Sequence, residues 1–436
     1  MFCKFVILPY YSLADVTNSA IGNKSNKNTD VAFFPKDNRK QFILIFIIAF
    51  LNLIGFGMII PLLPHYARSF RAGIMDTGLL VASYAAAQFI GSPIWGRLSD
   101  KIGRRPVLII TLAGSVVGYI LFGLAGSLWL LFVSRILSGF MSGNISVAQA
   151  YITDITDAKS RAEGLGIIGA AFGLGFILGP GMGGVLSVYG MEVPAYAAAG
   201  LNFFNLLFLA KLLPESYPPE KRLTVRVRRR FGQSLVELRE ALSRPLVGPL
   251  LYNRFFFSLA FAIFTTVFAI YAEFELHLSA RIIAYLLTYV GVLMVLVQGV
   301  LIGRLTRRFA EGNLLFYSIP LMVAALVGWA FVRDVAALAM VLAPLALASG
   351  VFNTVINSSL SKAVLEEEVG GMLGLSMAID SFTRILAPSA GSFLLAQFGS
   401  WAPGTAAAVL LCLVVPYAWR RFVAHPHPVL TSNLED

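Results

Sequence analysis

Twelve predominantly apolar stretches follow one another along the chain, separated by short polar segments. Most reach the roughly 20 residues that a tilted transmembrane helix needs. Helices are expected because a segment in lipid must satisfy its own backbone polar groups. The predicted spans are Phe42–Leu63, Thr77–Trp95, Val107–Ala125, Leu128–Ile152, Gly164–Val188, Pro194–Leu213, Leu250–Ala272, Ala280–Ile302, Leu314–Val332, Ala336–Leu360, Met372–Phe398 and Pro403–Arg420.

The composition supports a polytopic, all-α membrane protein. Of 436 residues, 57% are hydrophobic and 13% are charged, whereas a soluble protein is about 25% charged. The two cysteines, Cys3 and Cys412, are too far apart in sequence to suggest a disulfide framework or a metal site. The net charge of +11 does not indicate nucleic acid, because the charges lie in short segments beside apolar spans.

Lysine and arginine are concentrated in alternate loops, which predicts that both termini are cytoplasmic. An even number of spans agrees with this orientation. The residues assigned to the cytoplasmic side are Lys36, Arg39, Lys40, Arg97, Lys101, Arg104, Arg105, Lys159, Arg161, Arg304, Arg307, Arg308, Lys362, Arg420 and Arg421.

One long basic break divides the chain into two sets of six spans. The predicted order is a cytoplasmic tail (1–40), a six-helix bundle (41–213), a basic linker (214–248), a second six-helix bundle (249–422) and a cytoplasmic tail (423–436). Residues 1–40 also leave room for a signal peptide, although no small-residue cleavage site follows an apolar core.

A charged loop, 95–106, is predicted between the second and third spans. It reads Gly96-Arg97-Leu98-Ser99-Asp100-Lys101-Ile102-Gly103-Arg104-Arg105. This Gly-x-Leu-x-Asp-x-x-Gly-Arg-Arg pattern resembles the loop between helices two and three of the major facilitator superfamily. A generic basic turn is the alternative.

The resemblance implies twelve helices in two pseudo-symmetric six-helix bundles, with substrate bound between them at mid-membrane. A weak repeat agrees, because Gly303-Arg304-Leu305 occupies in the second half the place of Gly96-Arg97-Leu98. The resemblance also implies a conformational latch that bonds across the halves. Its candidate residues are Gly96, Asp100, Gly103, Arg104 and Arg105.

The fifth span is rich in glycine and contains a proline, which predicts close helix packing and a kink. It also resembles the fifth-helix signature of exporters that exchange substrate for protons. The matching residues are Gly175, Gly179, Pro180, Gly183 and Gly184. Simple close packing is the alternative role of these glycines.

Four ionisable residues are candidates for proton coupling. Arg135 lies inside the fourth span, where a charge costs at least about 2.5–3.5 kcal/mol. Its surroundings are similar to the fourth helix of proton-coupled drug exporters, whose arginine influences nearby carboxylates; snorkelling to the interface is the alternative. Asp380 and Arg384 have the spacing of a helical ion pair, either structural or opened by a proton or an anionic substrate. Glu273, at the outer end of the seventh span, is interfacial or titrates at a cavity mouth.

The first span is similar to that of tetracycline/proton antiporters, but Asn52 stands where many of them carry an acid. Asparagine does not titrate, so another acid couples protons or the coupling differs. The resemblance implies that helices one, four, seven and ten line the cavity. Carried over by span, the substrate-binding candidates are Asn52, Asn144, Gln149, Phe261, Phe264, Asn353 and Asn357. Phenylalanines on such helices also commonly face lipid or pack against neighbours.

The sequence contains no phosphate-binding loop, no His/Cys metal cluster and no evident catalytic triad. We therefore expect no cofactor, no metal and no enzymatic activity. The expected partners are protons, the lipid bilayer and a small lipophilic substrate, with the chain acting as a monomer.

The predicted function is proton-coupled export of lipophilic drugs or metabolites by alternating access, in the plasma (inner) membrane. The alternative is proton-coupled or facilitated transport of a metabolite or lipid-like solute. A non-transporting sensor or scaffold is a third hypothesis.

Overall fold

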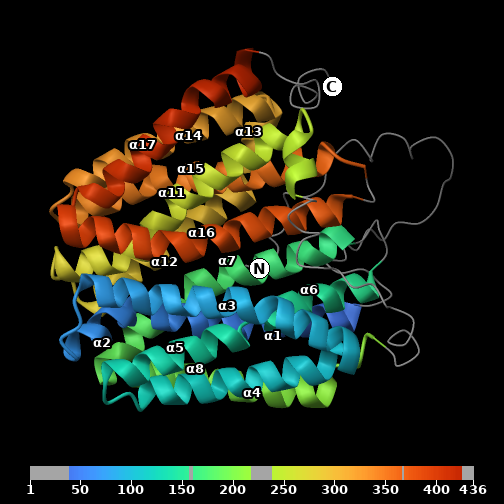
Figure 1. Ribbon diagram of the computed structural model, residues 1–436, viewed down its shortest axis with the longest axis vertical. Coiled ribbons are helices and arrows are strands. Elements are labelled where there is room, and N and C mark those ends of the chain that lie inside the picture. Colours follow the sequence, from blue (N-terminus) through green and yellow to red (C-terminus); the bar gives the residue numbers. More distant parts are fainter. Residues whose placement is uncertain (1–38, 157–160, 218–237, 366–367, 425–436) are drawn as a thin grey trace.

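The computed structural model describes residues 39–156, 161–217, 238–365 and 368–424. The predicted tails at 1–40 and 423–436 lie almost entirely outside this range, as does most of the predicted linker at 214–248. The described residues form helices joined by short turns, and the helices are grouped in two bundles (Figure 1).

The first bundle contains the six helices expected before the linker, several of them in two pieces. α1 packs against α7 and α8, while α4 packs against α5 and α8. The elements are α1 (Arg39–Ile59), η4 (Ile60–Leu62), α2 (Leu63–Ser69), α3 (Ile74–Ile102), α4 (Arg104–Gly123), α5 (Leu128–Met141), α6 (Asn144–Ile155), α7 (Arg161–Leu186), η5 (Ser187–Tyr189) and α8 (Val193–Leu212).

The second bundle repeats this plan. α11 packs against α16 and α17, and α14 packs against α15 and α17. The elements are α11 (Val247–Phe274), α12 (Ala280–Leu296), η6 (Val297–Leu301), α13 (Ile302–Arg308), α14 (Glu311–Phe331), α15 (Val335–Lys362), α16 (Val369–Phe398), α17 (Ala402–Trp419) and η7 (Arg420–Ala424).

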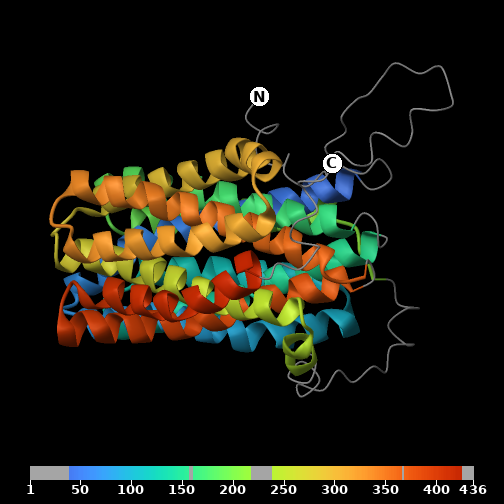
Figure 2. The same cartoon turned by 90° about the horizontal axis from the view of Figure 1, so that it is seen from above.

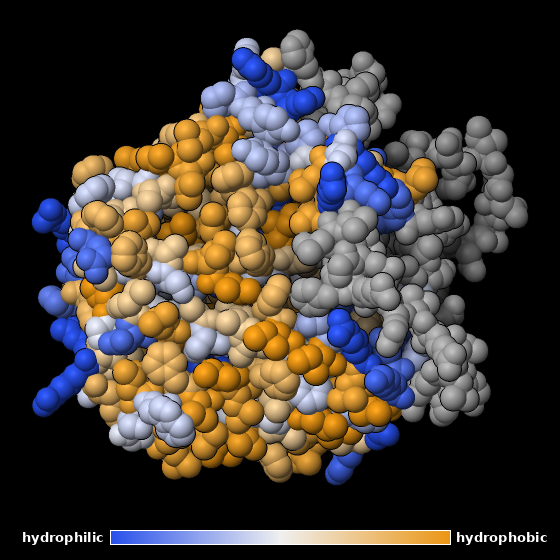
Figure 3. Space-filling view, viewed as in Figure 1, coloured by the Kyte–Doolittle hydropathy of each residue, from blue (hydrophilic) through white to orange (hydrophobic). Residues whose placement is uncertain are grey.

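All twelve predicted spans coincide with helices in the described part of the chain. Eleven helical runs there are long and apolar enough to cross a membrane. The remaining one, α16, has 30 residues but is more polar, since it carries Asp380, Arg384 and several serines and glycines. Figure 3 shows the result on one face, an apolar belt with hydrophilic residues gathered at the two ends of the helices.

Each bundle has its own apolar core. The buried hydrophobic residues of the second bundle form one cluster, and those of the first form three separate clusters. The bundles meet mainly through two helix pairs, α3 with α16 and α7 with α12, with smaller contacts of α11 with α2 and α3. Their helices run roughly alongside one another in both views (Figures 1 and 2). The interface between the halves is therefore built mainly from the second, fifth, eighth and eleventh helices.

Three predicted spans have features that the apolar pattern did not indicate. The first span continues past Leu63 to Ser69 through a 3₁₀ turn at Pro61. The fourth span is broken at Ser142–Gly143, between α5 and α6. The eighth contains a π-helical segment, η6. Such interruptions free backbone groups and occur often at functional sites.

The predicted charged loop at 95–106 is largely helical. α3 runs to Ile102 and α4 begins at Arg104, so Gly103 alone makes the turn. Its φ of 105° lies in the left-handed region that favours glycine. Gly96 instead lies inside α3, and no neighbouring heavy atom would lie within 4 Å of an added Cβ. Only the second glycine of the motif is therefore required by the backbone of this turn.

Candidate functional site

Polar and charged side chains inside the bundles gather at three levels: the predicted cytoplasmic end, mid-helix and the predicted outer end. The largest group surrounds Arg104, which is 6% exposed. Its guanidinium donates to Asp154 at 2.9 Å, to Ser99 at 2.6 Å and to Asp100 at 2.5 Å. Asp100 belongs to α3 and Asp154 to α6. Arg104 therefore links the start of α4 to the ends of both helices.

The same end is reinforced by Glu215. Its carboxylate accepts the backbone N–H groups of Arg104 and Arg105 at 2.8 and 3.2 Å, which satisfies free donors at a helix N-terminus. The Arg105 side chain donates to the carbonyl of Ala210 on α8. In this structure the candidate latch therefore binds inside the first bundle, and Asp100 contacts Arg104 rather than the second half.

We call the contacts of Arg104 with Asp100 and Asp154 an ionic clamp. The second bundle has a corresponding clamp, centred on a carboxylate instead of a guanidinium. Glu311 begins α14, as Arg104 begins α4. Its buried carboxylate accepts from Ser358, Ser359 and Lys362 at the end of α15, at 2.8–2.9 Å. The pseudo-symmetry of the halves thus keeps the position of an ionic clamp while reversing its sign.

Asp380 has a different partner from the one its spacing suggests. Its two carboxylate oxygens accept from Nε and Nη2 of Arg254 on α11, and Ser258 donates to the same group at 2.6 Å. A forked guanidinium aligned with both oxygens gives a stronger interaction than a single contact. The expected pairing with Arg384, four residues further along α16, is therefore not the ion pair found here.

Arg135 lies inside the first bundle and is 4% exposed. Its guanidinium lies over the ring of Tyr84 on α3, 4.3 Å from the centroid. Among the described residues it has no ion pair or hydrogen bond, and its Nε is buried without a partner. The side chain therefore does not snorkel, and a cation–π contact gives only partial compensation for burying its charge.

The two halves are joined at the predicted outer end by a cluster around Glu273. This carboxylate ends α11 and accepts from Arg68 at 3.0 Å and also contacts His65, both in α2. The Arg68 guanidinium lies over the Phe274 ring as well. Glu273 is 6% exposed, so it is neither free nor fully interfacial but part of a titratable contact between the bundles.

The fifth-helix glycines provide close helix contacts. A Cβ at Gly179 would lie 2.8 Å from the Cα of Gly57 on α1, and one at Gly183 would lie 2.4 Å from the carbonyl oxygen of Met58. Gly184 instead faces Ala284 on α12, in the other half. Together with Gly175 and Pro180, these residues bring α7 against α1 and also against the second bundle.

The polar substrate-binding candidates differ in their burial and in their hydrogen-bond partners. Asn52 and Asn144 are buried, and the side-chain oxygen of Asn144 has no hydrogen-bond partner among the described residues. Gln149 donates to the sulfur of Met377 across the halves at 3.1 Å. Asn353 donates to the carbonyl of Ser349 in its own helix. Of these, Gln149 is placed between the bundles.

The two aromatic substrate-binding candidates, Phe261 and Phe264, differ in how deeply they are buried. Phe264 is 1% exposed and packs against Phe268 and Trp329 inside the second bundle. Phe261 is only half-buried, as is Asn357. Phe264 therefore contributes to the core of its own half, whereas Phe261 retains exposed surface.

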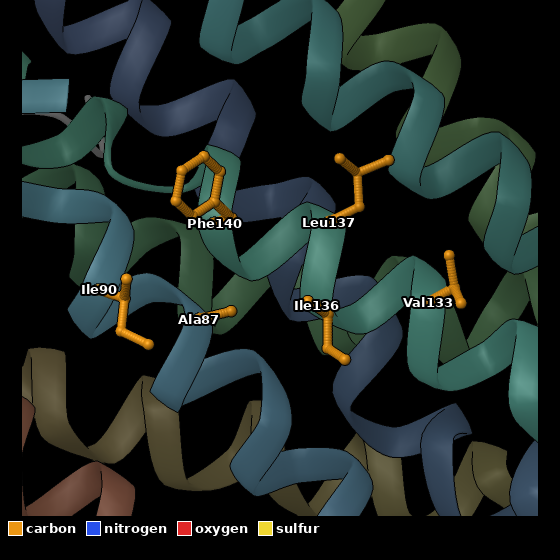
Figure 4. A pocket seen from close by; sticks show the side chains of 6 residues that line it. All are labelled: Ala87, Ile90, Val133, Ile136, Leu137 and Phe140. Carbon is orange, nitrogen blue, oxygen red and sulfur yellow. The ribbon is translucent and has the colours of Figure 1, made fainter. Parts of the chain in front are cut away.

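An apolar hollow of about 400 Å³ lies between α3 and α5 (Figure 4). It is lined by Ala87, Ile90, Val133, Ile136, Leu137 and Phe140. None of these side chains can orient a polar group, and Ile90 and Ile136 are about half exposed. This hollow belongs to the apolar outer surface rather than to the polar groups described above.

Sequence reasoning missed several residues of these clusters. Arg254, His65 and Arg68 were not predicted as partners because each meets a carboxylate that is more than a hundred residues away. Arg254 had one local signal, since it is a charge seven residues inside an apolar helix. Glu311 could have been found from the internal repeat, because it occupies the place of Arg104.

Comparison with known proteins gives a consistent result. The sequence model of the Major Facilitator Superfamily matches residues 45–347. Tetracycline resistance protein, class C, of Escherichia coli is 31% identical over 379 residues, which cover 83% of this chain and 93% of that protein. Solute carrier family 22 member 18 of Rattus norvegicus is 28% identical over 389 residues, covering 87% and 93%.

The fold is also similar to that of solved structures. The crystal structure of the human organic anion transporter MFSD10 (TETRAN) superposes with a TM-score of 0.67. It covers 88% of this chain and all of that one, at 22% sequence identity. At this identity the similarity establishes a common fold.

Proposed function

The chain belongs to the Major Facilitator Superfamily and is a multi-pass membrane transporter of small molecules, and from this premise we propose that it exports lipophilic drugs or metabolites in exchange for protons. The two bundles would rock about a central site, opening alternately to each side of the membrane. We place both termini in the cytoplasm and the protein in the plasma (inner) membrane, with the halves at 41–213 and 249–422, the basic linker between them and a tail at each end.

The contact of Glu273 with His65 and Arg68 is the observation that carries this proposal. It joins the halves at the predicted outer end through ionisable groups, with the Glu273 side chain 8% exposed. Protonation of Glu273 removes the charge that binds Arg68 and so weakens the contact between the bundles. A proton arriving from outside would then favour opening toward the outside, as proton-driven export requires.

The direction of transport is supported by two further observations. The fifth-helix glycines resemble the signature of exporters, and they form the contacts of α7 with α1 and α12. Relatives that are about 30% identical are named for resistance to tetracycline. Export from the cell is one direct way for a transporter to confer drug resistance.

We assign roles to three groups of residues. Arg135, Asp380, Arg384 and Glu273 would couple protons to transport, with Arg254 added because it binds Asp380. The motif around Asp100 and Arg104 would release or form its contacts as the bundles rock. The candidates on the first, fourth, seventh and tenth helices would contact substrate, Phe264 excepted because it is packed inside its own half.

Everted membrane vesicles from cells that express the chain provide the test. An acidic interior should drive accumulation of labelled tetracycline or a lipophilic fluorescent dye. Nigericin, which dissipates the pH gradient, should reduce accumulation to the level of vesicles that lack the chain. Accumulation that ignores the collapsed gradient would exclude proton exchange.

Proton-coupled or facilitated transport of a metabolite or lipid-like solute is the second candidate. It is favoured by Asn52, which is 8% exposed and cannot take up a proton where many related exporters carry an acid. It also agrees with the solute carrier relatives that are 28–29% identical. This alternative predicts that solute equilibrates in the same vesicles without a pH gradient.

A further inference from the structure

The charges carried by the middle parts of the membrane helices do not balance. Four ionisable residues of the described helices lie at least seven residues from the nearest end of their span: Arg135, Arg254, Asp380 and Arg384. Three are cations and one is an anion, so their formal charges sum to +2. An unbalanced charge in hydrocarbon is unfavourable and is usually retained for a functional reason.

The single carboxylate is already fully engaged. Both oxygens of Asp380 accept from Arg254, and Ser258 also donates to it. Asp380 therefore neutralises Arg254, and the excess charge resides on Arg135 and Arg384.

Arg135 has no anionic partner within the described chain. Its side chain is more than nine-tenths buried, its Nε has no hydrogen bond, and its closest aromatic contact is Tyr84. An arginine does not lose its proton under biological conditions. The burial of this guanidinium therefore leaves unused donors that a bound anion can satisfy.

Arg384 lies in the other half, on α16, which packs against the helix α3 that carries Tyr84. Ser392, about two turns after Arg384, lies against Gly78, about two turns before Tyr84. Arg384 is exposed and forms no ion pair among the described residues. Arg135 and Arg384 thus belong to the two helices, α5 and α16, that pack against α3 from the two bundles, and neither forms an ion pair among the described residues.

Tyr84 belongs to a group of three aromatic rings joined by ring contacts. The rings of Phe56 and Tyr84 are stacked with centroids 5.0 Å apart, and Phe176 contacts Phe56 edge-on at 6.3 Å. These three rings come from α1, α3 and α7. An apolar body, aromatic or aliphatic, would find a matching surface here.

We infer that the transported substrate is an amphipathic organic anion, whose carboxylate or sulfonate binds between Arg135 and Arg384 while its apolar body rests on Phe56, Tyr84 and Phe176. This inference rests on the proposed transport function and specifies its substrate class. An anion that contacts both guanidiniums bridges the two bundles, so its binding would also favour their approach.

The test uses three naphthalene probes that share an apolar body and differ in charge: 2-naphthalenesulfonate, neutral 2-naphthol and a naphthylmethyl trimethylammonium cation. Binding to the purified full chain is measured at pH 7 by equilibrium dialysis. The sulfonate should bind at least about tenfold more tightly than the neutral probe, because hydrogen bonds to charged groups are the stronger ones.

Arg135→Gln and Arg384→Gln should each lower the affinity for the sulfonate about tenfold. The affinity for 2-naphthol should remain nearly unchanged in both variants. Arg135→Lys and Arg384→Lys should retain most of the preference. Arg333→Gln is the matched control, since Arg333 is exposed in a turn. If Arg135→Gln does not fold, Arg384→Gln decides, because that side chain is exposed.

Equal binding of the three probes, a preference for the cation, no binding of the sulfonate, or an unchanged preference in Arg384→Gln would each overturn the inference. The vesicle assay separates this failure from that of the proposed function. Gradient-driven accumulation of a cationic or neutral dye without any anion preference would reject only the substrate class. Anion selectivity with flux that ignores the pH gradient would reject only proton exchange.

Discussion

At the scale of single residues, Asp380 shows that spacing along one helix does not determine which ion pair forms. Arg384 lies one helical turn away, at a distance suited to an i,i+4 pair. Arg254 instead supplies two aligned donors from another helix, and Ser258 supplies a third. A partly buried carboxylate such as Asp380 is stabilised most by the geometry that satisfies both oxygens, so the more distant partner in sequence is the one that binds.

The two motif glycines permit a sharp prediction. Gly103→Ala should destabilise the protein by about 1–2 kcal/mol, because an L-residue is strained at positive φ, and the φ of Gly103 is 105°. Gly96→Ala should be neutral or slightly stabilising, because alanine favours a helix interior and meets no neighbouring atom there. Thermal unfolding of the purified variants compares them; equal losses for both would contradict the assigned turn.

At the scale of helices, interruptions and small residues control how segments approach each other. The fourth helix breaks after Met141, where Trp95 donates to the carbonyl of Phe140 at 2.8 Å. Gly91 and Gly139 allow the backbones of α3 and α5 to pack directly against each other at this point. A break near the middle of a helix is a common setting for a transporter site, and here it lies about two helical turns beyond Arg135.

The fifth helix gives the second test. Gly179→Ala would bring a methyl group within 2.9 Å of backbone atoms of Gly57 and Ile54, which cannot move as a side chain does. We expect a loss of stability of about 1–3 kcal/mol, together with slower transport. Gly173→Ala is the control in the same helix, where the nearest atom lies at 4.0 Å. Similar behaviour of the two variants would show that close packing is unimportant here.

At the scale of the whole molecule, the two halves share a plan but differ in charge. The clamp on Arg104 and the clamp on Glu311 occupy corresponding helix starts with opposite signs. The contacts of α3 with α16 and of α7 with α12 join the halves. Each bundle therefore holds together independently, and the ionisable contacts between them are free to change during rocking.

The outer contact gives the test at this scale. Glu273→Gln removes the negative charge that binds Arg68 and should weaken the attachment of the two bundles. Spin labels on the outer ends of α2 and α11 should then report a longer distance at neutral pH, similar to that of the parent protein at acidic pH. The neighbouring variant Glu275→Gln changes an exposed side chain and should not alter the distance. A pH-dependent distance that survives in Glu273→Gln would assign the proton to another group.

The sequence by itself determined the twelve helices, their grouping and the glycine contacts of the fifth helix. These follow from local properties, namely the length of each apolar run, the side chains that lipid accepts and the absence of a Cβ. Tertiary structure alone decided which charges meet: Asp380 with Arg254, Glu273 with His65 and Arg68, and Arg135 with no anion among the residues that the structure describes. Electrostatic contacts depend on distances of a few ångströms between segments far apart in the chain, and only the packing of whole helices fixes those distances.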